Sequence, residues 1–321
     1  MKLSILGTGK IVHDLLEALK HVPEITLTSV FARPKSREKA EALAREWNIP
    51  NVYTDYAELL ESDDADFIYV GLINTVHYDY AKQALAAGRN VIVEKPFAPT
   101  YAEVKELVDL AQEKHTMLLE AVTLLYLPNF QAMQDALKSL GPVHAVLANY
   151  SQYSSRYDKY KEGVVLPAFD PELAGGALYD INIYNLNLIC GLFGAPEHAT
   201  YTANRGFNGV DTSGVATLVY PVFFATAVGA KDSASEGFCI IQGEKGWLEM
   251  QGAPNELPRV LVHAEGKDCV VEANQYEHRM VHEFQAFARI HATQDFDAVR
   301  RSNEQSLCVA KLVDELREQT H

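Results

Sequence analysis

The sequence predicts an α/β protein that begins with a doubly wound parallel sheet and continues into an open, mostly antiparallel sheet. Over the first 120 residues, six short apolar runs alternate with amphipathic helical stretches, as a parallel sheet with crossover helices requires. From residue 199 to 262, short strands recur between Gly and Pro turns instead. We therefore predict a dinucleotide-binding domain at 1–120 and a substrate and oligomerisation domain at 121–321, the latter closed by C-terminal helices.

The overall composition favours a cytoplasmic enzyme with a small-molecule substrate. A net charge of −15 disfavours broad binding to nucleic acid or to anionic membranes. No stretch reaches the roughly 18 apolar residues of a membrane helix, and residues 1–7 do not resemble a signal peptide. The four cysteines lack metal or redox spacing.

A glycine turn follows the first predicted strand, residues 2–6, and opens a helix. Gly7 permits a tight turn, and Gly9 lets a pyrophosphate approach the helix N-terminus beside Lys10 and Ile11. Val12 stands where the usual fingerprint has a third glycine, a position that governs packing of helix on strand. The motif predicts nucleotide binding, with an ordinary strand–helix turn as the alternative.

The end of the second strand, Ile25 to Ala32, indicates the type of nicotinamide cofactor. An NAD site has an acidic residue near this point, but here the chain continues with cations. Arg33, Ser36 and Arg37 are placed to bind a 2′-phosphate. We therefore favour NADP, with NAD as the alternative cofactor; solvated charge at a helix start would also explain these residues.

Two further predicted strands end at the same edge of the sheet. The fourth strand ends at Leu72, after which Asn74 either binds the nicotinamide ribose or caps a helix. His77 either lines the pocket or occupies the first helical turn. The fifth strand ends in Glu94-Lys95-Pro96, a charged pair at the carboxyl end of a buried strand, where open α/β sheets bind ligands.

The second domain is predicted to carry the substrate residues. Helix 125–140 and strand 142–152 lead into an aromatic segment in which Arg156 and Tyr157 form a predicted pocket wall. In the next helix Asp180, Tyr184 and Asn187 are spaced by four and three, which predicts one polar helix face. Burying such a row of polar side chains costs free energy unless they form hydrogen bonds or take part in a functional site.

Two remaining features concern metals and partners. His278 and His282 are four residues apart, but Arg279 stands where a zinc protease has its glutamate, so we predict a solvated helix face and no metal. The strands within 199–262 leave a large sheet face to cover, which favours a homodimer or higher oligomer.

Together these motifs resemble the Gfo/Idh/MocA oxidoreductases over essentially the whole chain. The resemblance depends on the glycine turn, Asn74 with His77, Glu94-Lys95-Pro96, and the segment Gly175-Gly176-Ala177-Leu178-Tyr179-Asp180. It implies an N-terminal Rossmann domain, a catalytic Lys95 and an acidic Asp180. Tyr184, where many relatives have histidine, resembles the branch of dihydrodiol and xylose dehydrogenases and glucose–fructose oxidoreductase, in which this tyrosine is the acid/base. That branch generally prefers NADP.

The resemblance implies reversible hydride transfer between a nicotinamide and a hydroxyl-bearing carbon of a sugar, polyol or dihydrodiol-like substrate. A base must take the hydroxyl proton as the hydride leaves. An ammonium such as that of Lys95 favours a phenolate on Tyr184 and stabilises a developing alkoxide, while Asp180 orients the pair. The alternative function is a cofactor-binding sensor of the same fold without turnover.

Overall fold

The computed structural model describes residues 1–62 and 64–319, which form two compact units. Unit 1 comprises residues 1–122 and 280–307, and unit 2 comprises residues 123–279 and 308 onward. The first break between the units follows Val122; the predicted domains and their roles stay a prediction. The units differ from the predicted domains at residues 280–307, which belong to unit 1.

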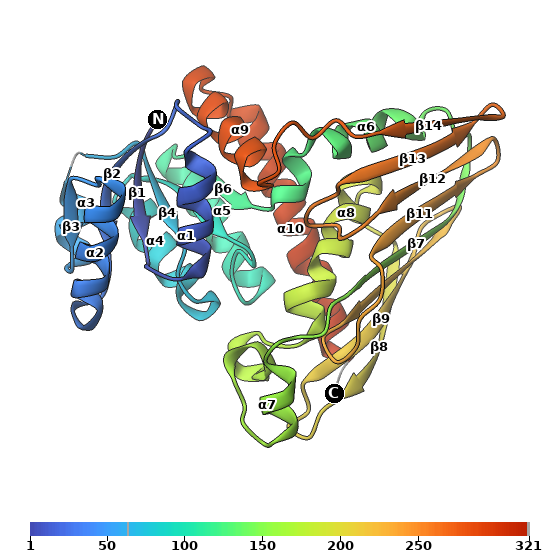
Figure 1. The fold of residues 1–321 in the computed structure, drawn as a ribbon, viewed down its shortest axis with the longest axis horizontal. Helices are drawn as coiled ribbons and strands as arrows, with labels where there is room; N and C mark the ends of the chain where they lie inside the picture. Colours follow the sequence, from blue (N-terminus) through green and yellow to red (C-terminus); the bar gives the residue numbers. More distant parts are fainter. Residues whose placement is uncertain (63, 320–321) are drawn as a thin grey trace. The chain divides into compact units, whose positions relative to one another are not determined.

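Unit 1 is built on a six-stranded sheet in the order β3-β2-β1-β4-β5-β6, with every neighbouring pair parallel (Figure 1). Its central strands are apolar on both faces and almost completely buried, as helices on both faces require. This confirms the predicted doubly wound sheet. The strands are β1 (Lys2–Leu6), β2 (Thr26–Phe31), β3 (Asn51–Tyr53), β4 (Phe67–Val70), β5 (Asn90–Glu94) and β6 (Leu118–Ala121).

Helices connect these strands as the sequence predicts. Helix α1 buries Val12, Leu15 and Leu16, the apolar stripe seen in the sequence. A capping box of Thr100 and Glu103 starts α5. The helices are α1 (Lys10–Leu19), η1 (Pro34–Ser36), α2 (Arg37–Trp47), α3 (Tyr56–Glu61), η2 (Asn74–Val76), α4 (His77–Ala86) and α5 (Tyr101–Lys114).

Helix α9 (Met280–Thr293) packs on the same unit, which explains why it is not part of the second domain. It contacts α1, and its Phe284 ring lies 5.8 Å from the Tyr69 ring of β4. Its His291 ring meets Phe67 edge-on at 5.6 Å. The last helix, α10 (Phe296–Glu318), contributes residues up to Leu307 to unit 1 and the remainder to unit 2.

Unit 2 contains an eight-stranded sheet in the order β14-β13-β12-β11-β7-β10-β9-β8. All neighbouring pairs are antiparallel except β7 with β10, so the sheet is mostly antiparallel, as predicted. The strands are β7 (Val143–Ser151), β8 (His198–Arg205), β9 (Asp211–Val219), β10 (Phe224–Ala230), β11 (Phe238–Gly243), β12 (Gly246–Gln251), β13 (Arg259–Ala264) and β14 (Lys267–Val271).

The two faces of this sheet differ in burial. One face carries buried side chains such as Val146, Ile241 and Met250. Helix α8 (Ile183–Phe193, labelled in Figure 1) contacts β7 and β10. On the other face, alternate residues are exposed, among them the large apolar side chains of Val219, Phe224, Val228 and Val270.

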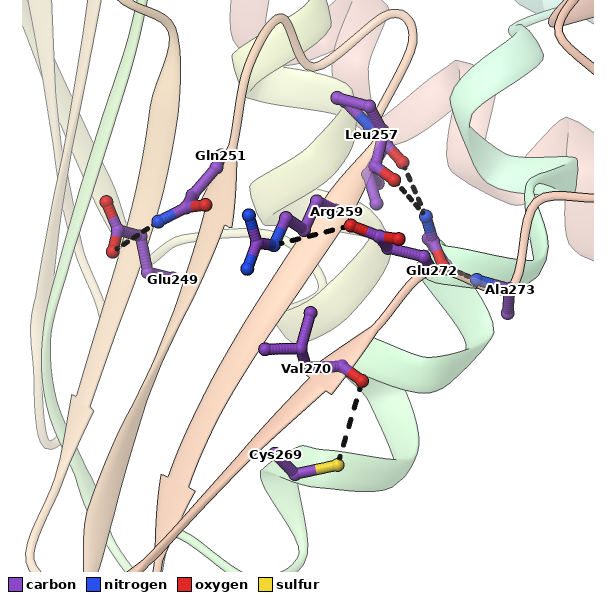
Figure 2. A network of polar contacts seen from close by, with 10 residues as sticks. Glu249, Gln251, Leu257, Arg259, Cys269, Val270, Glu272 and Ala273 are labelled. Carbon is purple, nitrogen blue, oxygen red and sulfur yellow. Dashed lines mark hydrogen bonds and ion pairs between the residues drawn. The ribbon is translucent and has the colours of Figure 1, made fainter.

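The predicted helix 125–140 is divided in the structure. A 3₁₀ turn, η3 (Thr123–Tyr126), precedes helix α6 (Pro128–Leu137), because Pro128 takes the first helical position, where its missing N–H costs nothing. The Asn129 carboxamide holds α6 against the sheet: its Nδ2 donates to the Leu257 and Pro258 carbonyls, and its Oδ1 accepts from the Ala273 N–H. Leu257 and Ala273 are labelled in Figure 2.

Figure 2 also shows the polar side chains on the neighbouring strands. Arg259 Nε lies 3.5 Å from Glu272 Oε1, and Gln251 donates to Glu249. The Arg259–Glu272 ion pair is exposed and contributes little to stability. The remaining elements of unit 2 are α7 (Tyr157–Lys161), η4 (Pro167–Phe169), η5 (Pro171–Leu173) and a π-helical turn, η6 (Leu178–Asn182).

Among the described helices, none combines the length and the apolarity needed to cross a membrane.

Candidate functional site

A cleft of about 340 Å³ opens at the carboxyl ends of β1, β2 and β4 in unit 1. We call it the cofactor cleft. Eight predicted cofactor-binding residues line it, among them Leu72 after β4. The lining residues are Gly7, Thr8, Gly9, Lys10, Ile11, Ala32, Arg33, Ser36, Gly71, Leu72, Ile73, Val76 and Tyr80.

The glycine turn fits a bound pyrophosphate. Gly7 has φ of 115°, and a Cβ there would lie 2.6 Å from the Gly71 carbonyl oxygen, so no side chain fits. A Cβ on Gly9 would meet nothing within 4 Å. Gly9 is the N-cap of α1 and provides no side-chain cap, so the helix N-terminus is available to an anion.

Val12, at the position of the missing third glycine, is accommodated by Gly71 on the neighbouring strand connection. Val12 is fully buried, and a Cβ built on Gly71 would lie 3.0 Å from Val12 Cγ2 and 2.6 Å from Tyr69 Cε1. The absence of a side chain at Gly71 therefore provides the space that the valine occupies.

The predicted phosphate-binding cations do not all reach the cleft. Arg33 and Ser36 line it, on the turn that follows β2. Arg37 begins α2, and its Nε donates to Glu41 Oε1 at 2.8 Å, one helical turn further along. Arg33 and Ser36 are thus the better placed for a ribose phosphate.

His77 is completely buried and does not line the cleft. Its Nδ1 lies 2.9 Å from the Pro96 carbonyl oxygen and its Nε2 lies 3.0 Å from the Leu72 carbonyl oxygen. Burial lowers the pKa of His77, as does the charge of Lys95, although the contacts with the carbonyl groups oppose this. A neutral imidazole has one N–H, so it donates to only one of these carbonyls at a time. Asn74, in η2, also lies outside the lining residues. Glu94, Lys95 and Arg37 are not among the lining residues either. All of the predicted cofactor contacts, in the cleft and outside it, stay predictions.

Lys95 lies at the carboxyl end of β5, on a turn held by buried side chains. Its peptide bond to Pro96 is cis. Glu94 accepts a hydrogen bond from the Tyr69 hydroxyl at 2.7 Å and another from the Lys95 N–H at 3.2 Å. The Phe97 N–H donates to Glu120 Oε1 at 3.0 Å. Lys95 itself is partly exposed, so its backbone is fixed while its side chain is accessible.

Glu120, at the end of β6, is buried and titrates abnormally. Its Oε2 accepts a hydrogen bond from Ser306 Oγ at 2.6 Å. Burial raises the pKa of Glu120 to about 7, while the Ser306 and Phe97 donors and the Lys95 charge act in the opposite direction. The carboxyl group is therefore partly protonated near neutral pH.

In unit 2, Asp180 lies within the π-helical turn η6 and Tyr184 lies in the first turn of α8. The Asp180 carboxylate is half-exposed, and its Oδ2 lies 2.9 Å from Nζ of the buried Lys231. Tyr184 is almost completely buried and meets the Tyr150 ring edge-on at 5.8 Å. The π turn means that the predicted polar face is not one regular α-helical face.

Asn187 is buried, and its Nδ2 donates to the Ile183 carbonyl of its own helix at 2.9 Å. Arg156 is exposed immediately before α7. The Tyr157 ring packs 5.7 Å from Phe169, against the small core of Tyr160, Phe169 and Val210. Substrate contacts by Arg156, Tyr157, Tyr184 and Asn187 stay predictions.

Sequence reasoning missed Tyr69, Glu120, Ser306 and Lys231. Lys231 follows an almost entirely apolar strand, the same signal that identified Lys95, and Glu120 interrupts an apolar run. Within residues 1–62 and 64–319 no group of three or more His, Cys, Asp or Glu side chains is arranged to hold a metal ion.

Residues 1–122 match the model of the oxidoreductase family with an NAD-binding Rossmann fold, GFO_IDH_MocA, and residues 130–249 match the model of the GFO/IDH/MocA C-terminal domain. Scyllo-inositol 2-dehydrogenase (NADP(+)) IolU of Bacillus subtilis is 31% identical over 319 residues, covering 99% of this chain and 97% of that protein. The chain belongs to the Gfo/Idh/MocA family. It is therefore an oxidoreductase with a nicotinamide-dinucleotide-binding domain, as the motifs predict.

Three further proteins are similar to this chain. D-xylose 1-dehydrogenase (NADP(+)) 2 of Haloferax volcanii is 28% identical over 326 residues, covering 99% of this chain and 97% of that protein. Trans-1,2-dihydrobenzene-1,2-diol dehydrogenase of Xenopus tropicalis is 34% identical over 224 residues, 68% of this chain and 65% of that protein. KijD10, a 3-ketoreductase from Actinomadura kijaniata solved with NADP and TDP-benzene, has the same fold (TM-score 0.85, 22% identity, 99% and 97% coverage).

Proposed function

We propose that this protein catalyses reversible hydride transfer between NADP(H) and a hydroxyl-bearing carbon of a sugar, polyol or dihydrodiol-like substrate. The observation that carries the proposal is Lys95, partly exposed on a turn that the buried side chains of Glu94 and Glu120 hold in place. Family membership and relatives named as NADP(+) dehydrogenases support the reaction class.

The cofactor assignment is supported by the cofactor cleft. The backbone around Gly9 and the N-terminus of α1 would hold the pyrophosphate. Arg33 and Ser36 would bind the 2′-phosphate that distinguishes NADP from NAD, since guanidinium and hydroxyl groups both donate to phosphate oxygens. A bound nicotinamide would accept or supply the hydride.

In the proposed reaction, Tyr184 exchanges a proton with the substrate hydroxyl, and Lys95 provides the positive charge that stabilises the developing alkoxide. Asp180 is the acidic partner in this arrangement, and its half-exposed carboxylate agrees with such a role. Lys95 belongs to unit 1, whereas Asp180 and Tyr184 belong to unit 2.

The test is a dehydrogenase screen over aldoses, inositols and trans-dihydrodiols with NADP and NAD, followed by variants. We expect turnover with NADP in at least one class. Tyr184→Phe and Lys95→Met should each lower kcat about a hundredfold or more, because each removes a group from proton transfer or charge stabilisation. Tyr150→Phe is the matched control, since it removes a hydroxyl from the ring beside Tyr184.

Two outcomes would contradict the proposal. Full activity in Tyr184→Phe would exclude its hydroxyl as the acid/base. Tight NADPH binding without turnover on any substrate of the screen would instead indicate a cofactor-binding sensor.

We also propose a cytoplasmic homo-oligomer assembled through the open face of the unit 2 sheet. That face exposes Val219, Phe224, Val228 and Val270, an apolar surface suited to a second copy. All four cysteines are without disulfides, which agrees with a reducing compartment. Sedimentation velocity should show a dimer or higher species, and Phe224→Glu/Val228→Glu should shift it to monomer. A wild-type monomer at micromolar concentration would contradict this.

A further inference from the structure

Lys231 is a lysine enclosed in the core of unit 2. It follows β10 directly, and its side chain is 2% exposed. Its Nζ lies 2.9 Å from Asp180 Oδ2, donates to the Ala168 carbonyl oxygen, and lies 4.5 Å from the centre of the Phe169 ring. The ammonium thus joins the π turn η6 to the segment around η4.

The two partners of this ion pair differ sharply in exposure. Lys231 is buried, whereas 42% of the Asp180 side chain is exposed. Burying an ammonium costs more free energy than an apolar side chain of similar volume would, so such a pair is poor evidence of a purely stabilising role. In this pair the Asp180 side chain is partly exposed to solvent, while its Oδ2 atom contacts the buried Lys231 ammonium.

A second carboxylate holds the same turn. Asp211 Oδ2 accepts hydrogen bonds from the Leu178 N–H and from the Tyr201 hydroxyl, both at 2.7 Å. Burial raises the pKa of Asp211, and the Lys231 charge lowers it. Gly176 allows the close approach, since a Cβ there would lie 1.9 Å from Asp211 Oδ1. The turn is therefore fixed at Leu178 by Asp211 and at Asp180 by Lys231.

We propose that Lys231 is a positioning residue for the reaction, holding the Asp180 carboxylate in one orientation on the π turn that leads into α8, the helix of Tyr184. This inference rests on the proposed function. Lys231 does not touch substrate; it acts through Asp180, and through Ala168 it also fixes the segment that carries Phe169.

The test is a double-variant cycle of Lys231→Met, Asp180→Asn and the two combined, with Lys267→Met on the exposed strand β14 as control. Lys231→Met should lower kcat about tenfold to a hundredfold, as misplacement of a reacting group does, with the KM for NADPH within about twofold of the wild-type value. Because Lys231 acts through Asp180, the double variant should be no slower than Asp180→Asn alone. Lys267→Met should match the wild type.

Thermal unfolding separates this role from a structural one. Asp180→Asn should lower Tm because it removes a carboxylate that is in contact with a buried ammonium, and adding Lys231→Met should restore much of that loss. If Lys231→Met alone does not fold, the double variant is compared with Asp180→Asn. Failure of both to fold would assign Lys231 to the core and overturn the proposal.

The kinetic outcomes are equally decisive. If the losses of kcat in Lys231→Met and in Asp180→Asn multiply in the double variant, Lys231 does not act through Asp180. That result, or a wild-type kcat in Lys231→Met, would overturn the positioning role while leaving the proposed function intact. Absence of any turnover by the wild-type protein would overturn the proposed function itself.

Discussion

The Nδ1 atom of His77 lies 2.9 Å from the carbonyl oxygen of Pro96, and this contact joins the start of α4 to the turn that carries Lys95. The other ring nitrogen lies 3.0 Å from the Leu72 carbonyl, beside the cofactor cleft. One buried imidazole therefore links the cleft to the proposed catalytic lysine within unit 1.

His77→Phe should weaken both the fold and the activity. The phenyl ring keeps the volume but removes the hydrogen bond that the imidazole donates to the Pro96 or the Leu72 carbonyl, which should lower the free energy of unfolding by about 2 kcal/mol. Urea unfolding at pH 7.5 measures this, and kcat should fall because the Pro96 turn loses a contact. His13→Phe, at an exposed position of α1, is the control. Equal unfolding midpoints for the wild type and His77→Phe would show that the imidazole contacts contribute nothing.

Glu120→Gln should remove a pH dependence of stability. Because the pKa of Glu120 is raised to about 7 in the folded protein, the folded state binds this proton more tightly than the unfolded state does. Wild-type stability should therefore fall as pH rises from about 4.5 to 7, by about 3 kcal/mol for this group. Urea unfolding of wild type and Glu120→Gln at pH 5, 6, 7 and 8 should show their difference growing with pH. The exposed Glu113→Gln should follow the wild type throughout; a constant difference for Glu120→Gln would exclude its titration in this range.

Arg33→Ala should change cofactor preference more than Arg37→Ala does. Arg33 lines the cleft, whereas the Arg37 guanidinium is paired with Glu41. Loss of a charged hydrogen bond to phosphate costs about 1.5–3 kcal/mol, so the KM for NADP should rise about tenfold to a hundredfold. The KM for NAD, which lacks the phosphate, should change little. Equal effects on both cofactors, or a larger effect from Arg37→Ala, would reassign the phosphate site.

Gly71→Ala should destabilise unit 1, because its Cβ would meet Tyr69 and Val12 at 2.6 and 3.0 Å. Overpacking of this kind costs about 1–3 kcal/mol. Val12→Ala in the same chain should recover part of the loss, since the removed methyl groups give back space. Thermal unfolding of both single variants and the double variant measures this coupling; strictly additive losses would contradict it.

Much of unit 1 was predictable because its signals are local. Helices alternate with the strands of unit 1 as expected, and the glycine turn leads into α1. The π turn at Asp180 was not predictable, since it depends on Asp211 in β9 and on Lys231 just after β10, which are distant from it in sequence. The parallel pairing of β7 with β10 and the placement of α9 with unit 1 also depend on contacts between distant segments, so local sequence patterns did not predict them.

The fit between Val12 and Gly71 has a consequence for how dinucleotide-binding chains are recognised. The third glycine of the fingerprint serves to free volume between helix and strand, and here the small residue stands on the opposite side of the contact, about 60 residues later in the chain. A search for three glycines at fixed spacing finds an incomplete motif in this chain, because Val12 replaces the third glycine. A search that accepts a small residue on either side of the helix–strand contact would find the motif complete.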